Sequence, residues 1–271
     1  PTLTLVYLPH LDYNLQRYGE QDPRVHADLA EIDEVLRDLI GFFTARGVEV
    51  VVLSEYGITD VDRPVHVNRA LREAGWLAIR EESGWELLDA GASQAFAVAD
   101  HQIAHVYVKD PVKVADVVQL LEKIEGVGQV LHGDSLHAAG LDHPRAGEVV
   151  AIAEPHAWFT YYYWMDDQKA PDFARCVDIH RKYGFDPVEL FIDPNLRFPK
   201  LHLARRLLQK KLGFRMRMDV IPLDAELVCG SHGHLPTDSL DWPVLLGDFD
   251  FPDASKIAAT DVHAHLLSWC L

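Results

Sequence analysis

The first 53 residues hold two apolar runs with one amphipathic segment between them, and this order restricts the fold more than any other feature of the chain. Residues 3–8 and 48–53 are short and apolar, so each run predicts a buried strand. Apolar side chains recur at spacings of three and four over residues 25–43, which predicts a helix, with Asp22 as its N-cap and Pro23 as its first residue. A strand, a helix and a strand in this order predict a right-handed crossover in a parallel sheet.

Polar segments follow both expected strands. Asp12 comes shortly after the first strand, and Glu55 and Tyr56 come directly after the second. Because ligands of parallel α/β sheets bind outside the carboxyl ends of the strands, both segments are expected on one rim. The pentapeptide Gly230-Ser231-His232-Gly233-His234 adds a histidine held between glycines. A histidine with strand-end carboxylates is typical of a metal site, and a structural role in a tight turn is the alternative.

Shorter patterns fill the middle of the chain. The expected elements are a helix over 67–74, a hairpin over 76–89, strands over 95–99 and 105–108, a helix over 112–124 and a strand over 128–131. Together they predict a small α+β subdomain. We therefore divide the chain into a core segment with the first two polar motifs (1–75), the small subdomain (76–150) and a return to the core with the closing histidine motif (151–271).

Two later segments have an unusual composition. Residues 158–164 are densely aromatic, and no basic residues interleave with them, so a packed hydrophobic wedge is favoured over a base-stacking surface. Residues 200–212 form the one basic stretch and have a helical pattern. A solvated helix face is expected there, and a patch for a partner or an anionic surface is the alternative.

Composition argues against several partners. Lys and Arg number 25 against 42 Asp and Glu, a net charge of −17, so neither nucleic acid nor an anionic membrane is an expected partner. A phosphate ester would need a local positive source at its site, which a metal ion supplies. The three cysteines lack close spacing, which indicates a reducing compartment and hence a cytoplasmic location. No run of about 20 apolar residues predicts a transmembrane helix.

Taken together, three segments resemble one family. Residues 11–19 (Leu-Asp-Tyr-Asn-Leu-Gln-Arg-Tyr-Gly) resemble the Asp-x-x-Gly-His-x-x-Gly element of type I phosphodiesterases/nucleotide pyrophosphatases, in the alkaline phosphatase superfamily. Residues 54–58 (Ser-Glu-Tyr-Gly-Ile) resemble its Ser-Asp-His-Gly-Met, and residues 230–233 its closing Gly-x-His-Gly. The resemblance implies an α/β, alkaline-phosphatase-like fold, with a mostly parallel sheet flanked by helices and a small α+β subdomain. It covers nearly the whole chain, but only the later half to two-thirds of a family domain.

The resemblance also implies a site where two zinc ions clamp a phosphoryl group. By position, Asp12 and His232 match two ligands of one ion, and Gln16 stands where its other histidine is expected. Glu55 and Tyr56 stand where the second ion's aspartate and histidine are expected. Glu55 keeps a carboxylate, whereas Gln16 and Tyr56 are weaker ligands that would line the site or contact the substrate. We expect a divalent metal, zinc first, with manganese or iron as alternatives.

Residues 178–187 are a candidate replacement for the altered ligands. Asp178 and His180 project to the same side of an extended segment, where they would replace a lost metal ligand, with Arg181 or Lys182 facing a phosphate. A solvated loop with a local salt bridge is the alternative. His101 and His105 are interpreted as structural, and His263 and His265 as part of an exposed helix start.

These features predict a metal-dependent phosphoric ester hydrolase of the phosphodiesterase/nucleotide pyrophosphatase type, acting on a small phosphorylated substrate. No catalytic nucleophile is assigned, because the family's hydroxyl residue would lie before Pro1. The missing N-terminal part of the same domain is therefore an expected partner, and it would place a strand beside residues 3–8. A catalytically inactive family member that binds a phosphorylated ligand is the alternative.

Overall fold

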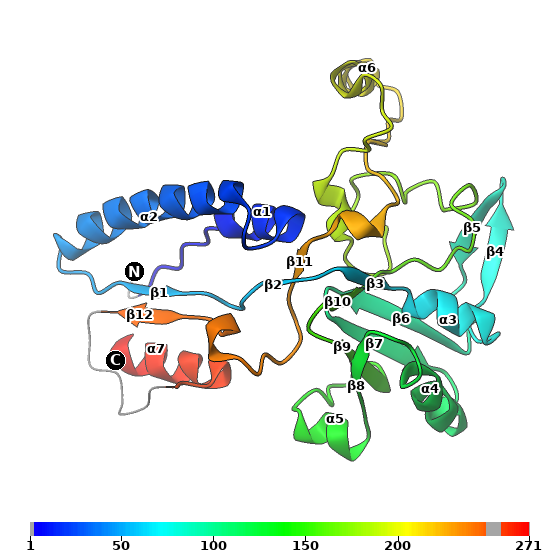
Figure 1. The fold of residues 1–271 in the computed structure, drawn as a ribbon, viewed down its shortest axis with the longest axis horizontal. Helices are drawn as coiled ribbons and strands as arrows, with labels where there is room; N and C mark the ends of the chain where they lie inside the picture. The colour runs from blue at the N-terminus through cyan, green and yellow to red at the C-terminus, as the bar shows by residue number, and fades with distance from the viewer. Residues whose placement is uncertain (1–2, 248–255, 271) are drawn as a thin grey trace.

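The computed structural model describes residues 3–247 and 256–270, which form two parts joined by extended chain (Figure 1). The first part combines both ends of the chain. It consists of α1 (His10–Tyr18), α2 (Pro23–Thr44), β1 (Val51–Leu53), β12 (Leu245–Gly247), the 3₁₀ turns η4 (Ser239–Asp241) and η5 (Ala259–Asp261), and α7 (Val262–Cys270). In Figure 1, α2 lies on one side of the β1–β12 pair and α7 on the other.

The second part holds most of the remaining elements. Its strands are β3 (Arg63–Val65), β4 (Ile79–Glu82), β5 (Trp85–Leu88), β6 (Ala95–Asp100), β7 (Ile103–Val108), β8 (Val127–His132), β9 (Val149–Ala153) and β10 (Ala157–Phe159). Its helices and 3₁₀ turns are α3 (Val67–Glu73), η1 (Pro111–Lys113), α4 (Val114–Leu121), α5 (Asp134–Ala138), η2 (Pro187–Leu190), α6 (Pro199–Lys211) and η3 (Ala225–Leu227). Strands β2 (Thr59–Asp60) and β11 (Gly230–Ser231) pair where the chain passes between the parts (Figure 1).

The long helix predicted for residues 25–43 is confirmed as α2. The Asp22 side chain accepts a hydrogen bond from the Arg24 backbone N–H at 2.9 Å, and Pro23 occupies the first turn, as the sequence predicts. Among its residues only Val25 is fully buried, whereas Leu29 and Phe42 are exposed. The apolar face of α2 is therefore largely uncovered by the described residues.

The strand predicted for residues 3–8 is wrong. These residues form no strand in the structure and are exposed, with Leu5 at 80%. The second predicted strand shortens to Val51–Leu53 and pairs antiparallel with β12. Local sequence gives only a preference for extended backbone, and a strand forms only where a second strand accepts its hydrogen bonds.

The predicted mostly parallel sheet is likewise not found. Of the strand pairs in the described part of the chain, only β3–β10 is parallel. The largest sheet has the order β6-β7-β9-β8 and is antiparallel throughout. The coarser prediction of a mixed α/β protein is confirmed. The parallel crossover was inferred from residues 3–8, so it fails together with that strand.

The shorter elements predicted between residues 67 and 131 are confirmed. The β4–β5 hairpin turns at Ser83 and Gly84, whose φ values of 54° and 86° suit the primed turns that connect two-residue hairpins. Buried residues alternate along β6, because one face of its sheet packs on the core. Strand β9 extends this sheet to Ala153. The division of the chain at residues 75 and 150 remains a prediction.

The aromatic segment lies at the centre of the main core. Trp158, Phe159 and the run from Tyr161 to Trp164 are fully buried and belong to one hydrophobic cluster with α3, α4 and the large sheet. Edge-to-face contacts join Tyr161 and Tyr163 to the Trp164 ring. The predicted packed wedge is confirmed.

The basic helix α6 stands away from the rest of the second part (Figure 1). Its outer side chains are exposed, including Leu201, Leu208 and Lys211, in agreement with the predicted solvated face. No helix in the described ranges is both long enough and apolar enough to cross a membrane.

Candidate functional site

Helix α1 and strand β11 approach each other closely at the junction of the two parts. The Cys229 backbone N–H donates to the Gln16 carbonyl at 2.9 Å. A Cβ atom on Gly230 would lie 2.3 Å from the Leu15 carbonyl oxygen, so only glycine permits this approach. The first glycine of the closing motif thus brings His232 to the side of α1.

A cluster forms where the three motif segments meet. Asp12 and Gln16 are one turn apart on α1 and share a face. The Tyr56 hydroxyl donates to Asp12 Oδ1 at 3.2 Å. The Tyr56 ring stacks on the His232 ring, with 3.7 Å between centroids and an interplanar angle of 8°. Four of the residues predicted for the site therefore lie together, although they come from positions as far apart as 12 and 232.

His101 belongs to the same cluster, although sequence reasoning interpreted it as structural. Its ring stacks on His232 at 3.9 Å and on Phe185 at 4.7 Å. Its Nε2 lies 3.2 Å from Gln16 Oε1, and its Nδ1 lies 2.6 Å from Asp100 Oδ1. Asp100, His101 and Gln102 form a polar turn between the apolar strands β6 and β7. This polar turn is the sequence feature that could have identified His101 as a site residue.

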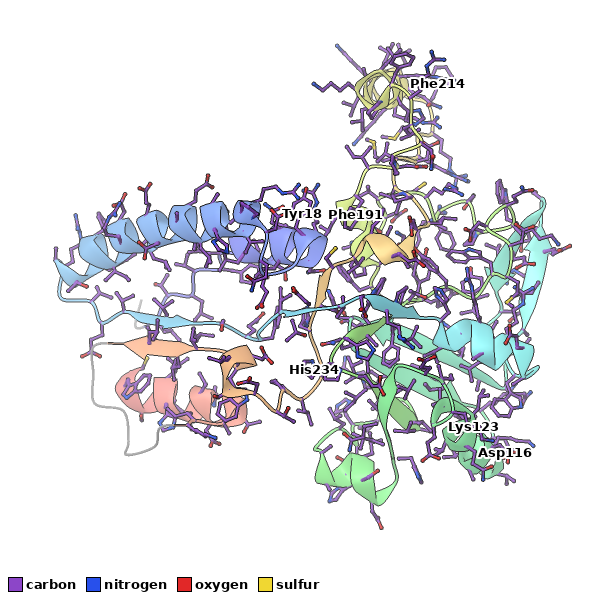
Figure 2. All side chains as sticks on the ribbon, in the orientation of Figure 1. Tyr18, Asp116, Lys123, Phe191, Phe214 and His234 are labelled. Carbon is purple, nitrogen blue, oxygen red and sulfur yellow. The ribbon has the colours of Figure 1, made fainter. Side chains whose placement is uncertain are left out.

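Gln102 fixes the closing motif in place. Its backbone N–H donates to the His232 carbonyl at 2.9 Å, and its side-chain Oε1 accepts from the His234 backbone N–H at 3.3 Å. Its amide also donates to the Pro155 and Ala157 carbonyls at 2.9 and 3.0 Å. The β6–β7 turn therefore holds His232 and His234 against the large sheet, at the place where Figure 2 labels His234.

Burial sets the protonation states in the cluster. Burial, followed by the charge of His101, lowers the pKa of His232 to about 3, so the imidazole is neutral at neutral pH. Burial and the Asp12 carboxylate raise the pKa of Tyr56 well above its ordinary value, so its phenol stays protonated. A neutral imidazole is a competent metal ligand, whereas a protonated phenol is a hydrogen-bond donor first.

The other predicted site residues lie outside this cluster. Glu55 is exposed, although its neighbour Tyr56 belongs to the cluster. Asp178 pairs with Arg181 at 3.8 Å, and its backbone N–H donates to Glu189 at 3.4 Å. His180 is exposed. No hydrogen bond, ion pair or ring contact links residues 178, 180 and 181 to Asp12 or His232 in the described ranges. Their geometry matches the alternative of a solvated loop with a local salt bridge.

The donor set of the cluster fits one divalent ion better than two. It comprises a carboxylate (Asp12), two imidazoles (His101 and His232) and an amide oxygen (Gln16), which suits zinc or a slightly harder ion. The atoms are not gathered around a point, since Asp12 is hydrogen-bonded to Tyr56. Side-chain rotation would therefore be needed to bind an ion.

A second, unpredicted group of donors lies on the first two helices. Among the described residues, the one set of three or more His, Cys, Asp or Glu with donor atoms all within 4.8 Å is His10, Asp28 and Glu31. Glu31 is highly exposed, and His10 Nε2 lies 3.4 Å from its carboxylate. His10 and Glu31 also have the geometry of a surface ion pair.

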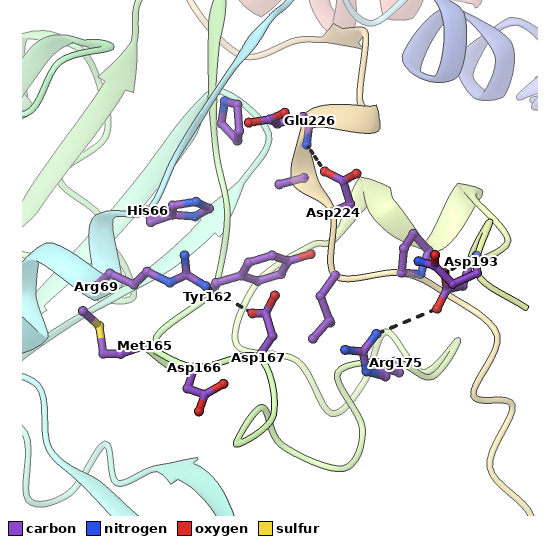
Figure 3. Close-up of a pocket in the computed structure, with 15 residues that line it drawn as sticks. His66, Arg69, Tyr162, Met165, Asp166, Asp167, Arg175, Asp193, Asp224 and Glu226 are labelled. Atoms are coloured by element: carbon purple, nitrogen blue, oxygen red, sulfur yellow. Dashed lines mark hydrogen bonds and ion pairs between the residues drawn. The ribbon is translucent and has the colours of Figure 1, made fainter.

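A cavity of about 680 Å³ lies elsewhere, over α3 and the aromatic core (Figure 3). Five carboxylates line it against two guanidinium groups, those of Arg69 and Arg175. Arg69 Nε donates a hydrogen bond to the Trp164 carbonyl at 2.7 Å, and the Arg175 guanidinium lies 3.9 Å from the Asp193 carboxylate. A phosphoryl group would be repelled by this lining, so we do not place the chemistry there.

Comparisons with known proteins identify the family. A family model described as type I phosphodiesterase / nucleotide pyrophosphatase matches residues 1–186. No curated protein matches the chain. Phosphonoacetate hydrolase from Sinorhizobium meliloti 1021, solved with phosphonoformate, aligns with a TM-score of 0.52 and 15% identity over 96% of this chain and 50% of its own. Murine ectonucleotide pyrophosphatase / phosphodiesterase 5 aligns with a TM-score of 0.41 and 17% identity over 57% of this chain and 38% of its own.

The extent of these matches defines what they support. The chain spans half or less of the length of these two solved structures, and the hydrolase supports the fold alone. The closing motif at residues 230–233 lies beyond the residues that the family model matches. Because that model covers well over half of the sequence, the chain belongs to the type I phosphodiesterase/nucleotide pyrophosphatase family.

Proposed function

We propose that this protein is a metal-dependent phosphoric ester hydrolase of the phosphodiesterase/nucleotide pyrophosphatase type. The observation that carries the proposal is the convergence of Asp12, Tyr56 and His232, one from each of the three motif segments, into contacts of 3.2 and 3.7 Å. The fold brings together segments that are distant in the sequence, and Asp12 and His232 are of the residue types that the resemblance places around the family's metal. Family membership supports the reaction class.

In this proposal Asp12 and His232 bind one divalent ion, which would stabilise negative charge on the phosphoryl oxygens. His232 is suited to this role because burial keeps its ring neutral. Gln16 and Tyr56 line the site, and the Tyr56 phenol can donate to a phosphoryl oxygen once it leaves Asp12. Zinc is the first candidate, and manganese or iron follow because Gln16 offers a neutral oxygen.

The hydroxyl nucleophile would come from the part of the family domain that has no counterpart in this chain. The exposed apolar side chains of residues 3–8 and α2 support a docking face for that part. The substrate would be a small phosphorylated molecule. The three cysteines are free in the structure, and the cytoplasmic location remains a prediction.

A non-catalytic role is the second candidate, and one contact favours it. The protonated Tyr56 phenol occupies the Asp12 carboxylate, which the ion would need. If this bond persists in the presence of metal, the protein would bind a phosphorylated ligand without hydrolysing it.

Metal content and hydrolysis, measured together, test both candidates. The protein is loaded with zinc and its bound metal is counted by mass spectrometry. Hydrolysis of bis-p-nitrophenyl phosphate is then followed after addition of the part of the family domain that has no counterpart in this chain. His232→Ala should lose metal and activity, and His263→Ala, at an exposed position on α7, should retain both. Metal bound without turnover would favour the non-catalytic role. Equal metal content in His232→Ala and its parent would defeat the proposed site.

A further inference from the structure

We propose that His101 supplies the imidazole that the site lacks at Gln16, so that Asp12, His101 and His232 together bind one divalent ion. Asp100 would act as the carboxylate that orients His101. This inference rests on the proposed metal-dependent function and names a ligand that no motif of the family predicts. In this interpretation, His101 compensates for the metal ligand that is lost because position 16 is glutamine and not histidine.

The position of His101 is the first argument. Its Nε2 lies 3.2 Å from Gln16 Oε1. This separation is that of a hydrogen bond and is also close to the distance of about 3.4 Å between two atoms that bind one tetrahedral zinc ion at about 2.1 Å, so His101 Nε2 lies beside the position where the family's histidine is expected. Gln16 is one turn from Asp12 on the same face of α1. His101 therefore brings an imidazole nitrogen to the face of α1 that carries the predicted carboxylate ligand.

The orientation of the ring is the second argument. Asp100 Oδ1 lies 2.6 Å from His101 Nδ1. Because an ionised carboxylate can only accept, Nδ1 carries the donated proton, and Nε2 is the nitrogen that remains to bind an ion. A carboxylate that fixes the tautomer of a metal-binding histidine in this way is a common feature of metal sites. That nitrogen faces Gln16 Oε1 at 3.2 Å, and because an amide oxygen also only accepts, the two lone pairs face each other and a bound cation would satisfy both.

The backbone and the burial of His101 are the third argument. Its φ is +56°, a region that residues with a Cβ rarely occupy and that often marks functional sites. A two-residue hairpin turn at this place would favour asparagine or glycine. His101 is only 6% exposed, and its ring lies between those of His232 and Phe185. A purely structural turn would therefore favour glycine or asparagine at position 101, whereas this chain has a buried histidine there.

Two side-chain rearrangements are required. The donor atoms of Asp12, His101 and His232 do not yet lie within 4.8 Å of one another, because this spacing is found only for His10, Asp28 and Glu31 in the described ranges. Asp12 is bonded to the Tyr56 hydroxyl. Rotation of the Asp12 side chain away from Tyr56 would turn its carboxylate toward the two imidazoles. One imidazole would also have to turn out of the ring stack, because stacked rings 3.9 Å apart do not direct their nitrogens to one point.

The test measures metal binding directly rather than activity. Cobalt(II) is titrated into the purified protein in competition with a chelator, and its visible absorption reports the coordination. His101→Ala should lower the affinity at least tenfold and change the spectrum. His105→Ala is the matched control, since His105 lies on β7 and its Nδ1 accepts from the Gly147 backbone N–H outside the cluster. It should behave like the parent.

Two further variants separate a ligand from a structural residue. Asp100→Asn keeps the ring stack and should weaken cobalt binding severalfold, which also keeps the proposal testable if His101→Ala fails to fold. Adding Gln16→His to His101→Ala should restore the affinity, because it returns an imidazole to the same ion. A structural role for His101 predicts no such rescue.

The outcomes distinguish this inference from the proposed function. If the parent and His232→Ala bind cobalt equally, the proposed function fails and the inference fails with it. If binding depends on His232 but His101→Ala matches the parent, the inference alone is overturned. Loss in His101→Ala with rescue by Gln16→His supports both.

Discussion

Tyr56→Phe tests whether Asp12 must leave one partner in order to bind an ion. The substitution removes the hydroxyl that donates to Asp12 Oδ1 at 3.2 Å and keeps the ring that stacks on His232 at 3.7 Å. Hydrogen bonds to charged groups contribute about 1.5–3 kcal/mol. This one is half-buried and, at 3.2 Å, is longer than the usual O–H···O bond, so we take about 1.4 kcal/mol, just below that range. Metal binding should therefore tighten about tenfold.

Chelator competition with zinc or cobalt measures this change, with Tyr13→Phe as the control. Tyr13 is exposed on α1 beside Asp12, so its substitution should leave the affinity unchanged. Weaker binding by Tyr56→Phe would mean that the phenol itself is a ligand. Unchanged binding would mean that Asp12 is not a ligand, and either result would refute the reasoning.

Three further predictions concern stability and association. Lys182→Met should lower the free energy of unfolding by about 3–5 kcal/mol, because Asp186 and Glu189, 2.9 and 2.6 Å from its Nζ, would lose their buried cation. Between pH 6.5 and 4, His66 should lower the free energy of unfolding by about 2–3 kcal/mol, because burial lowers its pKa to about 4 and the unfolded chain binds the proton more readily; His232 adds to the same fall. Exposed apolar residues 3–8 should make the chain self-associate, which light scattering measures.

Each of these has its own control. Urea unfolding of Lys182→Met should be compared with that of Lys200→Met, at an exposed helical position, and equal midpoints would argue against the buried pair. His66→Asn should reduce the pH dependence of the free energy of unfolding. An unchanged pH dependence would mean that other groups cause it. Leu5→Asp should reduce self-association, whereas a monomeric parent would contradict the exposed-face argument.

Local signals predicted the elements whose stability is local. The Asp22 cap and Pro23 define the start of α2, and the Ser83-Gly84 turn defines the β4–β5 hairpin, because both depend on residues a few positions apart. The strand at residues 3–8 failed for the opposite reason. A segment that prefers extended backbone forms a strand only when a neighbouring strand accepts its hydrogen bonds, and the sequence of residues 3–8 does not show whether such a neighbour exists.

The candidate site was predictable only in part. Motif spacing located Asp12, Tyr56 and His232, which meet in the structure. His101 was missed because its role depends on a ring stack and a contact with Gln16, which join positions far apart in the sequence. Asp178 was chosen from its spacing to His180, but spacing does not reveal that Asp178 pairs locally with Arg181.

Anomalous diffraction from crystals of the zinc-loaded protein tests the central claim most directly. The account predicts one zinc peak within about 2.0–2.2 Å of ligand atoms from Asp12 and His232, with His101 completing the protein ligands. A peak confined to the group of His10, Asp28 and Glu31, or no peak beside His232, would contradict it.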